Sequence, residues 1–542
     1  MAHNTTATTR LFDTLGILAR DPRIRIYFTR PQSSPFDTDT REFLATHGAT
    51  EIEWQDAVAL DFDMTISASY GGELHRLQAP LIVIPHGMGY NKYQNKEQRT
   101  KNKEQRTKNK EQSVFGLSPD WLLHDGKVVP SVIVLSHTEQ RERLRRSCPQ
   151  AVSRTLIAGD ICYDRLRASR PFRPSYRRAY GLRTAQRLIV ISTTWGPDSI
   201  LGTISDLPRK LAAELPVDEY RIALALHPNI RSFHSRWQVS EYLSDSARAG
   251  VEVLDDVQDW RTAVVAADLI VGDHGSIPFY GAALGIPLLL ATAPVQSVAP
   301  DSPSAQLLGT APRLDIDADI RQQIERTISE HRPDHYTDIA RLTTSAPDEG
   351  AALLRTVMYR TLNLPEPAEA VDITVLPLPA QTLDGPDSHL VRVRLGADRS
   401  ADITRFPAER LHASLDNGPE THLSVGMREP LRHWLDRADV VIGTSGPDTD
   451  QWISDTLSRL PGCALAAAPT PSGDWLLGDR ATVLRLTARM PAPRLFASLA
   501  YRLLCEHSGL VELVGEWTIR CGADMFTVTA APADHSIPAP RP

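Results

Sequence analysis

Short apolar runs alternate with polar, helix-compatible segments along most of this chain, and this alternation limits its fold more than any other feature. An apolar run too short for a helix fits a buried strand, and strands separated by helices form parallel sheets that are covered on both faces. The pattern therefore predicts an α/β fold with doubly wound, Rossmann-like sheets. Because 542 residues exceed what one hydrophobic core usually supports, we expect about two to four domains.

Two successive series of strands and helices are predicted before residue 364. The first has strands at residues 24–28, 52–54, 64–66, 81–84 and 132–135, with helices at 38–46 and 138–146. The second has strands at residues 188–192, 221–226, 251–254, 269–271 and 288–290, with helices at 200–215, 235–249 and 259–267. Residues 320–330 and 351–362 also suit helices, and we expect both to close the second domain.

These series predict one domain over residues 1–170 and a second over 175–363, joined near the prolines at 171–174. Two sheets with facing strand ends leave a cleft between them, which is a common place for a substrate.

The remainder of the chain is predicted to be an accessory domain and a tail. Closely spaced prolines at residues 364–367 indicate a linker. Residues 371–530 again mix strands (391–395, 440–443, 526–529) with helices (449–460, 493–507), which predicts a third α/β domain without a recognisable chemical motif. The proline-rich residues 531–542 are expected to be disordered.

Composition narrows the class of protein. The net charge of -7 argues against a surface that binds nucleic acid over the whole molecule. Five cysteines without a C-x-x-C pattern are interpreted as buried free thiols of a reducing compartment. The start of the chain has no apolar leader, and no long apolar run occurs anywhere. We therefore expect a cytoplasmic protein without a membrane span, with peripheral attachment to the membrane left open.

Residues 95–101 and 102–108 are the same seven residues, and 109–112 begin a third copy. The repeat has no apolar position, so it cannot form the seam of a coiled coil. Residues 91–112 carry eight basic and three acidic side chains. Two interpretations stay open: a mobile, solvated loop of the first domain, or a basic flap over an anionic ligand.

The turn Asp273-His274-Gly275-Ser276 lies where the strand at 269–271 leads into the apolar helix at 277–285. Open α/β sheets bind ligands outside the carboxyl ends of their strands, where backbone N–H groups and a helix N-terminus attract an anion. The turn therefore indicates a site for a phosphorylated ligand. The alternative is a turn that binds nothing.

Three further polar turns follow predicted strands. His86 is followed by Gly87 and Gly89, whose lack of side chains lets a ligand approach the backbone, and a histidine there can act as a general base. The alternative is a histidine that only caps a turn. His227 precedes Pro228, which is expected to forbid helix and hold His227 extended. The last turn is Thr193-Thr194-Trp195-Gly196.

The order of these motifs resembles the GT-B transferases of the CDP-glycerol glycerophosphotransferase type, and more distantly the UDP-N-acetylglucosamine 2-epimerases. The matching stretches, within residues 23–290, are His86-Gly87, Thr193-Thr194-Trp195, His227-Pro228 and Asp273-His274-Gly275-Ser276. Two arginines of the family are absent, since Leu224-Ala225-Leu226 precede His227 and Gly196 follows Trp195.

The resemblance implies two Rossmann-like GT-B domains, the second binding the donor, and transfer of a glycosyl or polyol-phosphate group from a nucleotide donor to a hydroxyl acceptor, such as a cell-envelope polymer. His86 is expected to remove the acceptor proton, and Asp273 to orient His227 or a ribose hydroxyl. The expected donor and phosphate contacts are His227, Thr193, Thr194, His274, Gly275 and Ser276. The expected acceptor side is Ser69, Tyr70, Gly87 and Gly89.

No metal or cofactor is expected, because helix dipoles and neutral donors would take the place of a cation. Two other functions stay open: a sugar-nucleotide epimerase or hydrolase of the same fold, and a non-catalytic binding or assembly module.

Overall fold

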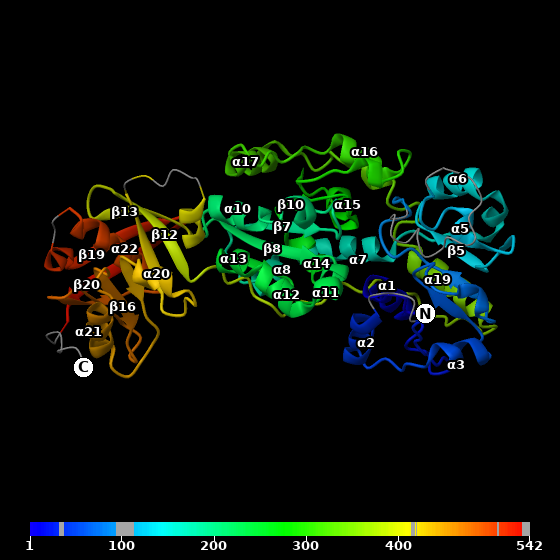
Figure 1. Ribbon diagram of the computed structural model, residues 1–542, viewed down its shortest axis with the longest axis horizontal. Helices are drawn as coiled ribbons and strands as arrows, with labels where there is room; N and C mark the ends of the chain where they lie inside the picture. The colour runs from blue at the N-terminus through cyan, green and yellow to red at the C-terminus, as the bar shows by residue number, and fades with distance from the viewer. Residues whose placement is uncertain (32–36, 94–112, 414–417, 419, 507–508, 534–542) are drawn as a thin grey trace.

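The computed structural model describes residues 1–31, 37–93, 113–413, 418, 420–506 and 509–533. Three sheets with their helices lie in a row along the long axis of the molecule (Figure 1). The mixed α/β architecture with parallel sheets agrees with the sequence prediction. Most of the repeat at 95–112 and the tail from 534 onward lie outside the described residues, so both expectations stay predictions.

The first sheet has four parallel strands in the order β1 (Thr65–Ser67), β2 (Leu81–Val83), β5 (Val132–Leu135) and β6 (Thr155–Ile157). Its helices α2 (Asp37–Thr46) and α6 (Thr138–Ser147) lie where they were predicted. A hairpin of β3 (Leu123–His124) and β4 (Lys127–Val128) follows the short helix α5 (Pro119–Leu122).

Residues 24–28 and 52–54 were predicted as strands, and this prediction is wrong. Between these segments only a bridge from Phe28 to Glu51 forms, and Trp54 already begins α3 (Trp54–Ala59). The start of the chain occupies the place beside β1, because the Met1 amino group donates to the carbonyl of Ile66 and the Ala2 N–H donates to that of Thr29.

The second sheet has five parallel strands in the order β11-β10-β7-β8-β9. These strands are β7 (Arg187–Thr193), β8 (Tyr220–Leu226), β9 (Val251–Val253), β10 (Leu269–Gly272) and β11 (Leu288–Leu290). All five agree with the predicted runs. The chain order reverses between β7 and β10, which is where doubly wound sheets open a crevice at their carboxyl ends.

Several helices around the second sheet differ from the predicted ones. The predicted helix at 200–215 is two, α9 (Ile200–Thr203) and α10 (Leu207–Glu214), and that at 235–249 is α12 (Arg236–Tyr242) and α13 (Ser244–Arg248). Pro228 begins an unpredicted helix, α11 (Pro228–His234). Proline suits the first position of a helix, where its missing N–H would have no partner within the helix.

Two helices after β11 cover different sheets. Helix α17 (Ile320–Glu330) packs on the second sheet, as predicted. Helix α19 (Gly350–Thr361) instead buries Leu354, Val357 and Met358 against α1 (Thr5–Leu15), which lies beside the first sheet. The expectation that it closes the second domain is therefore wrong, because its apolar stripe fits the core around Ala7 and Leu11.

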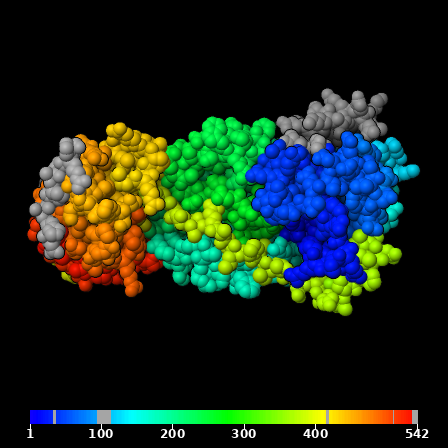
Figure 2. All heavy atoms as spheres, turned by 90° about the horizontal axis from the view of Figure 1, so that it is seen from below, coloured from blue at the N-terminus to red at the C-terminus, as the bar shows by residue number. Residues whose placement is uncertain are grey.

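The segment after α19 lies on the middle part of the molecule as an extended band, yellow-green in Figure 2. The hydroxyl of Tyr176 donates to the carbonyl of Leu376 at 2.8 Å, and the Leu383 N–H donates to that of Tyr180 at 3.0 Å. The predicted linker is thus the start of a chain segment packed against the helix α8 (Arg173–Ala179).

The third sheet is mixed and closes on itself through nine strands in the order β12-β13-β19-β20-β18-β17-β16-β15-β14. Their bounds are β12 (Ser388–Leu395), β13 (Ser400–Pro407), β14 (Thr421–Gly426), β15 (Val440–Ile442), β16 (Leu465–Pro469), β17 (Trp475–Gly478), β18 (Val483–Thr487), β19 (Gly515–Cys521) and β20 (Asp524–Pro532). Helix α22 (Ala492–Leu504) contacts strands from across the closed sheet, and α21 (Thr449–Arg459) packs on β16 and β17.

All five cysteines are free thiols. Four are buried as expected, whereas Cys505 is exposed, because it follows the last turn of α22 as the chain leaves the core. Among the residues that the structure describes, every helix is too short or too polar to cross a bilayer.

Candidate functional site

Two of the predicted turns touch each other across the first and second sheets. The loop after β2 carries His86, Gly87 and Met88, and the helix α15 (Ser276–Ala283) begins after β10. The Met88 N–H donates to the Ser276 hydroxyl at 3.2 Å. A Cβ added to Gly87 would lie 2.7 Å from the same oxygen, so only glycine fits here without a shift. The first sheet thus presents His86 beside the N-terminus of α15.

Asp273 holds the turn before α15 in place. Its buried carboxylate accepts hydrogen bonds from the N–H and the hydroxyl of Thr194, both at 2.7 Å, and from the Gly275 N–H at 2.9 Å. Burial raises the pKa of Asp273, while Lys92 and these hydrogen bonds lower it. The donors of Thr194 and Gly275 that were expected to hold phosphate are therefore engaged by this carboxylate. Its hydrogen bonds within the described chain do not include His227, so it does not orient that ring.

His227 is extended, as predicted, and caps α11. Its φ and ψ are -63° and 133°, and its Nδ1 accepts from the Asn229 N–H at 3.2 Å. The backbone N–H of His227 donates to the carbonyl of Thr193 at 3.2 Å, so His227 lies next to the end of β7. Burial, with Lys92 and His86 nearby, lowers the pKa of His227 to about 3. The hydroxyl of Thr193 donates to the carbonyl of Thr194 at 3.0 Å.

His274 contains a polar atom that nothing in the described chain satisfies. The residue is only 9% exposed, and its Nδ1 is buried without a hydrogen-bond partner. Burial lowers its pKa to about 3. A buried polar atom without a partner is rare in folded proteins, and this one stands directly before the N-cap of α15. The atom and the helix N-terminus together indicate a ligand there.

His86 is held by groups of the first sheet and α1. Its ring packs edge-on against Phe115, with centroids 5.4 Å apart. Its carbonyl accepts from Nε of Arg10 at 3.3 Å, and another nitrogen of Arg10 lies 3.4 Å from the hydroxyl of Tyr280 in α15. Burial, then Arg10, Lys92 and His3, lower the pKa of His86 to about 4.

Lys92 was not predicted as a site residue, yet its charge acts on Asp273 and on the three histidines described above. It shifts the pKa values of Asp273 and of the three imidazoles His86, His227 and His274. An antiparallel bridge to Val298 fixes its backbone to the part of the chain after β11. In the sequence, Lys92 stood out only as the first basic residue of the stretch 91–112. The basic-flap hypothesis itself concerns residues largely outside the described ranges.

The predicted acceptor side is only partly open. The Ser69 hydroxyl accepts from the Gly71 N–H at 3.1 Å, and Gly89 has a positive φ of 58° that glycine tolerates. Tyr70 is buried, with its hydroxyl 3.5 Å from that of Tyr90, and burial raises its pKa well above the ordinary value. Tyr70 therefore belongs to the core and not to an open acceptor surface.

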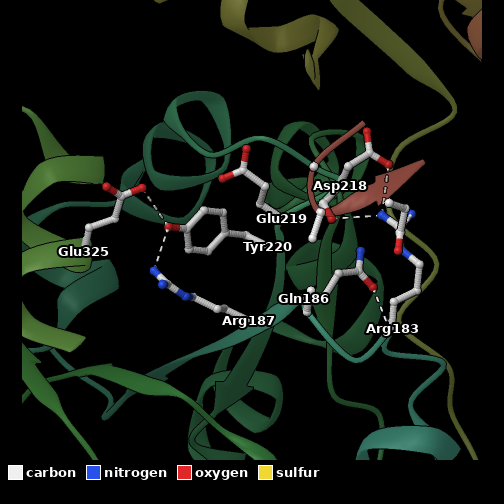
Figure 3. Close-up of a pocket in the computed structure, with 11 residues that line it drawn as sticks. Arg183, Gln186, Arg187, Asp218, Glu219, Tyr220 and Glu325 are labelled. Atoms are coloured by element: carbon white, nitrogen blue, oxygen red, sulfur yellow. Dashed lines mark hydrogen bonds and ion pairs between the residues drawn. The ribbon is translucent and has the colours of Figure 1, made fainter. Parts of the chain in front are cut away.

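A cavity of about 300 Å³ lies at the opposite, amino ends of β7 and β8 (Figure 3). Its four carboxylates are paired with arginines: Asp218 and Asp524 with Arg183, and Glu219 and Glu325 with Arg321. Asp218 also binds Arg405 of β13 at 2.7 Å. The pairs of Asp218 with Arg405 and of Asp524 with Arg183 join the third sheet to the second. The cavity lies at the end of the second sheet opposite to the four predicted turns.

No protein-family model matches the chain, and no curated protein matches it either. Among solved structures, it is similar to a variant of the wall teichoic acid polymerase TagF soaked with CDPG, with a TM-score of 0.45 and 12% identity over 67% of this chain and 86% of that one. It is also similar to Anabaena HepE in complex with UDP-glucose (TM-score 0.36, 13% identity, 67% and 96% covered). A third similar structure is the Neisseria meningitidis UDP-GlcNAc 2-epimerase bound to UDP-GlcNAc (TM-score 0.38, 12% identity, 67% and 98% covered). Both families that the motifs resemble are among these structures.

Proposed function

We propose that this chain is a transferase that moves a glycosyl or polyol-phosphate group from a nucleotide-activated donor to a hydroxyl acceptor. The observation that carries the proposal is the contact between the His86 loop and Ser276, beside the unpartnered Nδ1 of His274. It brings a group that can accept a proton next to a helix N-terminus that can hold a phosphate.

In this proposal the donor phosphates lie at the start of α15. The Ser276 hydroxyl accepts from Met88 and keeps its own proton to donate, and His274 Nδ1 is a second polar contact. Lys92 supplies the positive charge that the two absent arginines would have given. Asp273, Thr194 and Gly275 then shape the turn and do not touch the phosphates. The helix and Lys92 provide the charge, so the proposal needs no metal or cofactor.

In the chemical step, the neutral His86 imidazole takes the proton of the acceptor hydroxyl. The acceptor oxygen forms a bond to the transferred carbon or phosphorus atom as the bond from that atom to the leaving nucleotide oxygen breaks. The electron pair stays on the leaving phosphate, whose growing charge faces Ser276 and Lys92. A pKa of about 4 makes His86 a weak base in the free protein. A bound anion raises the pKa of a neighbouring imidazole, so the donor itself would strengthen this base.

A second candidate is a module that binds the same nucleotide without reaction. The observation that favours it is the use of the Thr194 and Gly275 donors by Asp273, which leaves fewer groups for a growing charge. Product analysis distinguishes the candidates: a transferase releases free nucleotide only with an acceptor, an epimerase or hydrolase changes the donor without one, and a binding module changes nothing.

Calorimetric titration of the full chain with CDP, UDP and their sugar or polyol conjugates tests the donor site. We expect Ser276→Ala and Lys92→Met each to weaken binding by roughly 10- to 150-fold, because a hydrogen bond to a charged group contributes about 1.5–3 kcal/mol. Lys127→Met, at an exposed lysine of β4, is the matched control and should bind as the natural chain does. Equal affinities in all four proteins would reject the proposed site.

A further inference from the structure

The start of α1 gathers buried polar atoms that the described chain leaves unsatisfied. Nδ1 of His3 and the hydroxyl oxygens of Thr5, Thr6 and Thr29 are all buried and have no hydrogen-bond partner. Thr5 is 4% exposed and Thr29 8% exposed. An unpartnered buried hydroxyl is unfavourable, and valine would fill the same space without that cost.

These atoms lie at the carboxyl edge of the first sheet. The Met1 amino group bonds to the carbonyl of Ile66 in β1 at 2.6 Å, and the Ala2 N–H bonds to that of Thr29 at 2.9 Å. The chain then passes Gly71, beyond the end of β1, so closely that a Cβ there would lie 2.2 Å from Nε2 of His3. Helix α1 therefore begins at the edge where His86 also stands.

The first turn of α1 offers a helix end without acidic side chains. The first turn of α1 contains no acidic residue, and Asn4 caps it by accepting from the Ala7 N–H at 2.8 Å. The nearest carboxylate to act on His3 is that of Asp37, which is paired with Arg30. The positive end of this eleven-residue helix therefore lies at Thr5 and Thr6, whose unpartnered hydroxyls can bond to an oxyanion.

The same place adjoins His86. His3 is among the groups that shift the pKa of His86, and Arg10 of α1 bonds to the His86 carbonyl at 3.3 Å. A ligand held at the first turn of α1 would therefore stand next to the imidazole, on the side of the first sheet.

We propose that His3, Thr5, Thr6 and Thr29 form a subsite for a phosphate group of the acceptor substrate. The assignment to the acceptor rests on the proposed function, whereas the phosphate subsite itself rests on the unpartnered atoms. The subsite would hold an acceptor by its phosphate, so that one of its hydroxyls reaches His86.

Thermal unfolding of the full chain with inorganic phosphate, against sodium chloride at equal ionic strength, tests the subsite. Phosphate should raise the melting temperature of the natural chain, because a ligand that binds only the folded form stabilises it. Thr5→Val and Thr29→Val should each melt roughly 2 °C higher without phosphate, since an unsatisfied hydroxyl is removed. Both variants should lose the rise that phosphate causes.

Thr9→Val is the matched control. It is a buried threonine of the same helix, but its hydroxyl donates to the carbonyl of Thr6 at 2.9 Å. This variant should melt lower than the natural chain and keep the full phosphate effect. A phosphate effect that survives in Thr5→Val and Thr29→Val, or that is absent from the natural chain, would overturn the subsite.

Lys92→Met separates this proposal from the donor site. If phosphate acts at α1, Lys92→Met keeps the effect and loses nucleotide affinity. If Lys92→Met abolishes the effect while Thr5→Val does not, phosphate occupies the donor site and only the subsite is rejected. If the effect depends on Thr5 but no nucleotide binds to any variant, the subsite stands as a phosphate site and the proposed function falls.

Discussion

The backbone N–H of Met88 donates to the side-chain hydroxyl of Ser276 at 3.2 Å, and this bond joins two segments that are 188 positions apart in the chain. One segment ends a strand of the first sheet and carries His86, and the other opens a helix on the second. In the proposed function, a phosphate at the helix N-terminus faces the loop that carries His86.

Gly87→Ala should weaken nucleotide binding. The added Cβ would lie 2.7 Å from Ser276 Oγ, so the serine must rotate and lose its bond to Met88. We expect a loss of about tenfold in affinity, measured by calorimetry. In a Ser276→Ala background the same substitution should cost much less, because the clash is gone, and an equal loss in both backgrounds would refute this explanation. Gly309→Ala, in α16 (Pro303–Thr310) with open space around it, should leave affinity unchanged.

Asp273→Asn should destabilise the fold. The carboxylate accepts three hydrogen bonds, and the amide would place its own N–H groups against some of these donors. We expect a loss of about 1–3 kcal/mol in the free energy of unfolding, measured with urea. Asp273→Ala should cost at least as much. A variant with unchanged stability would show that the turn does not depend on this residue.

Acid should destabilise the free protein through three imidazoles whose pKa values are lowered. The pKa values of His86, His227 and His274 lie at about 4, 3 and 3, below the ordinary value of about 6.5. The unfolded chain binds protons first, so the stability from these neutral rings is present above pH 6.5 and falls as the pH drops towards 4. His274→Gln should lose less melting temperature between pH 7 and pH 5 than the natural chain does. Equal losses would mean that His274 does not titrate in this way.

Nucleotide binding should be accompanied by proton uptake. An anion next to these rings raises their pKa values, so a ring that is neutral in the free protein gains protons near pH 6 when the ligand binds. Calorimetry in buffers of different ionisation enthalpy measures this uptake directly. His274→Gln should reduce it, and uptake that is unchanged in this variant would place the proton elsewhere.

The junction of the second and third sheets should be structural. The side chain of Asp218 is 3% exposed and binds Arg405 at 2.7 Å and Arg183 at 3.0 Å. Arg405→Met leaves a buried carboxylate with one partner fewer, and we expect it to cost about 3–5 kcal/mol in urea unfolding. Arg520→Met, which breaks an exposed pair with Asp402, should cost less than about 1 kcal/mol. Neither should change nucleotide affinity, and a change in it would connect the cavity of Figure 3 to function.

The sequence predicted the second sheet well because its strands are apolar runs bounded by turn residues, as at residues 269–271 before Asp273. The sequence-based prediction failed where one residue or one pattern is compatible with two structures. Pro228 ends an extended segment but also begins α11. The apolar stripe of α19 identified a helix, yet nothing in the stripe says which sheet it covers.

The site was predictable only where a local motif marks it. His86, His227 and the turn at 273–276 follow strands and carry glycine or proline, so their approach to one another could be expected. The capture of Thr194 by Asp273, 79 positions away, depends on strand order and could not be read from either motif. Lys92, Arg10 and His3 acquire their roles only through packing across the fold.

A crystal structure of the full chain with a bound nucleoside diphosphate tests the central claim most directly. The account predicts the phosphates at the N-terminus of α15, within hydrogen-bond distance of Ser276 and His274, with Lys92 facing them. A nucleotide bound anywhere else, such as the cavity between Arg183 and Glu325, would contradict it.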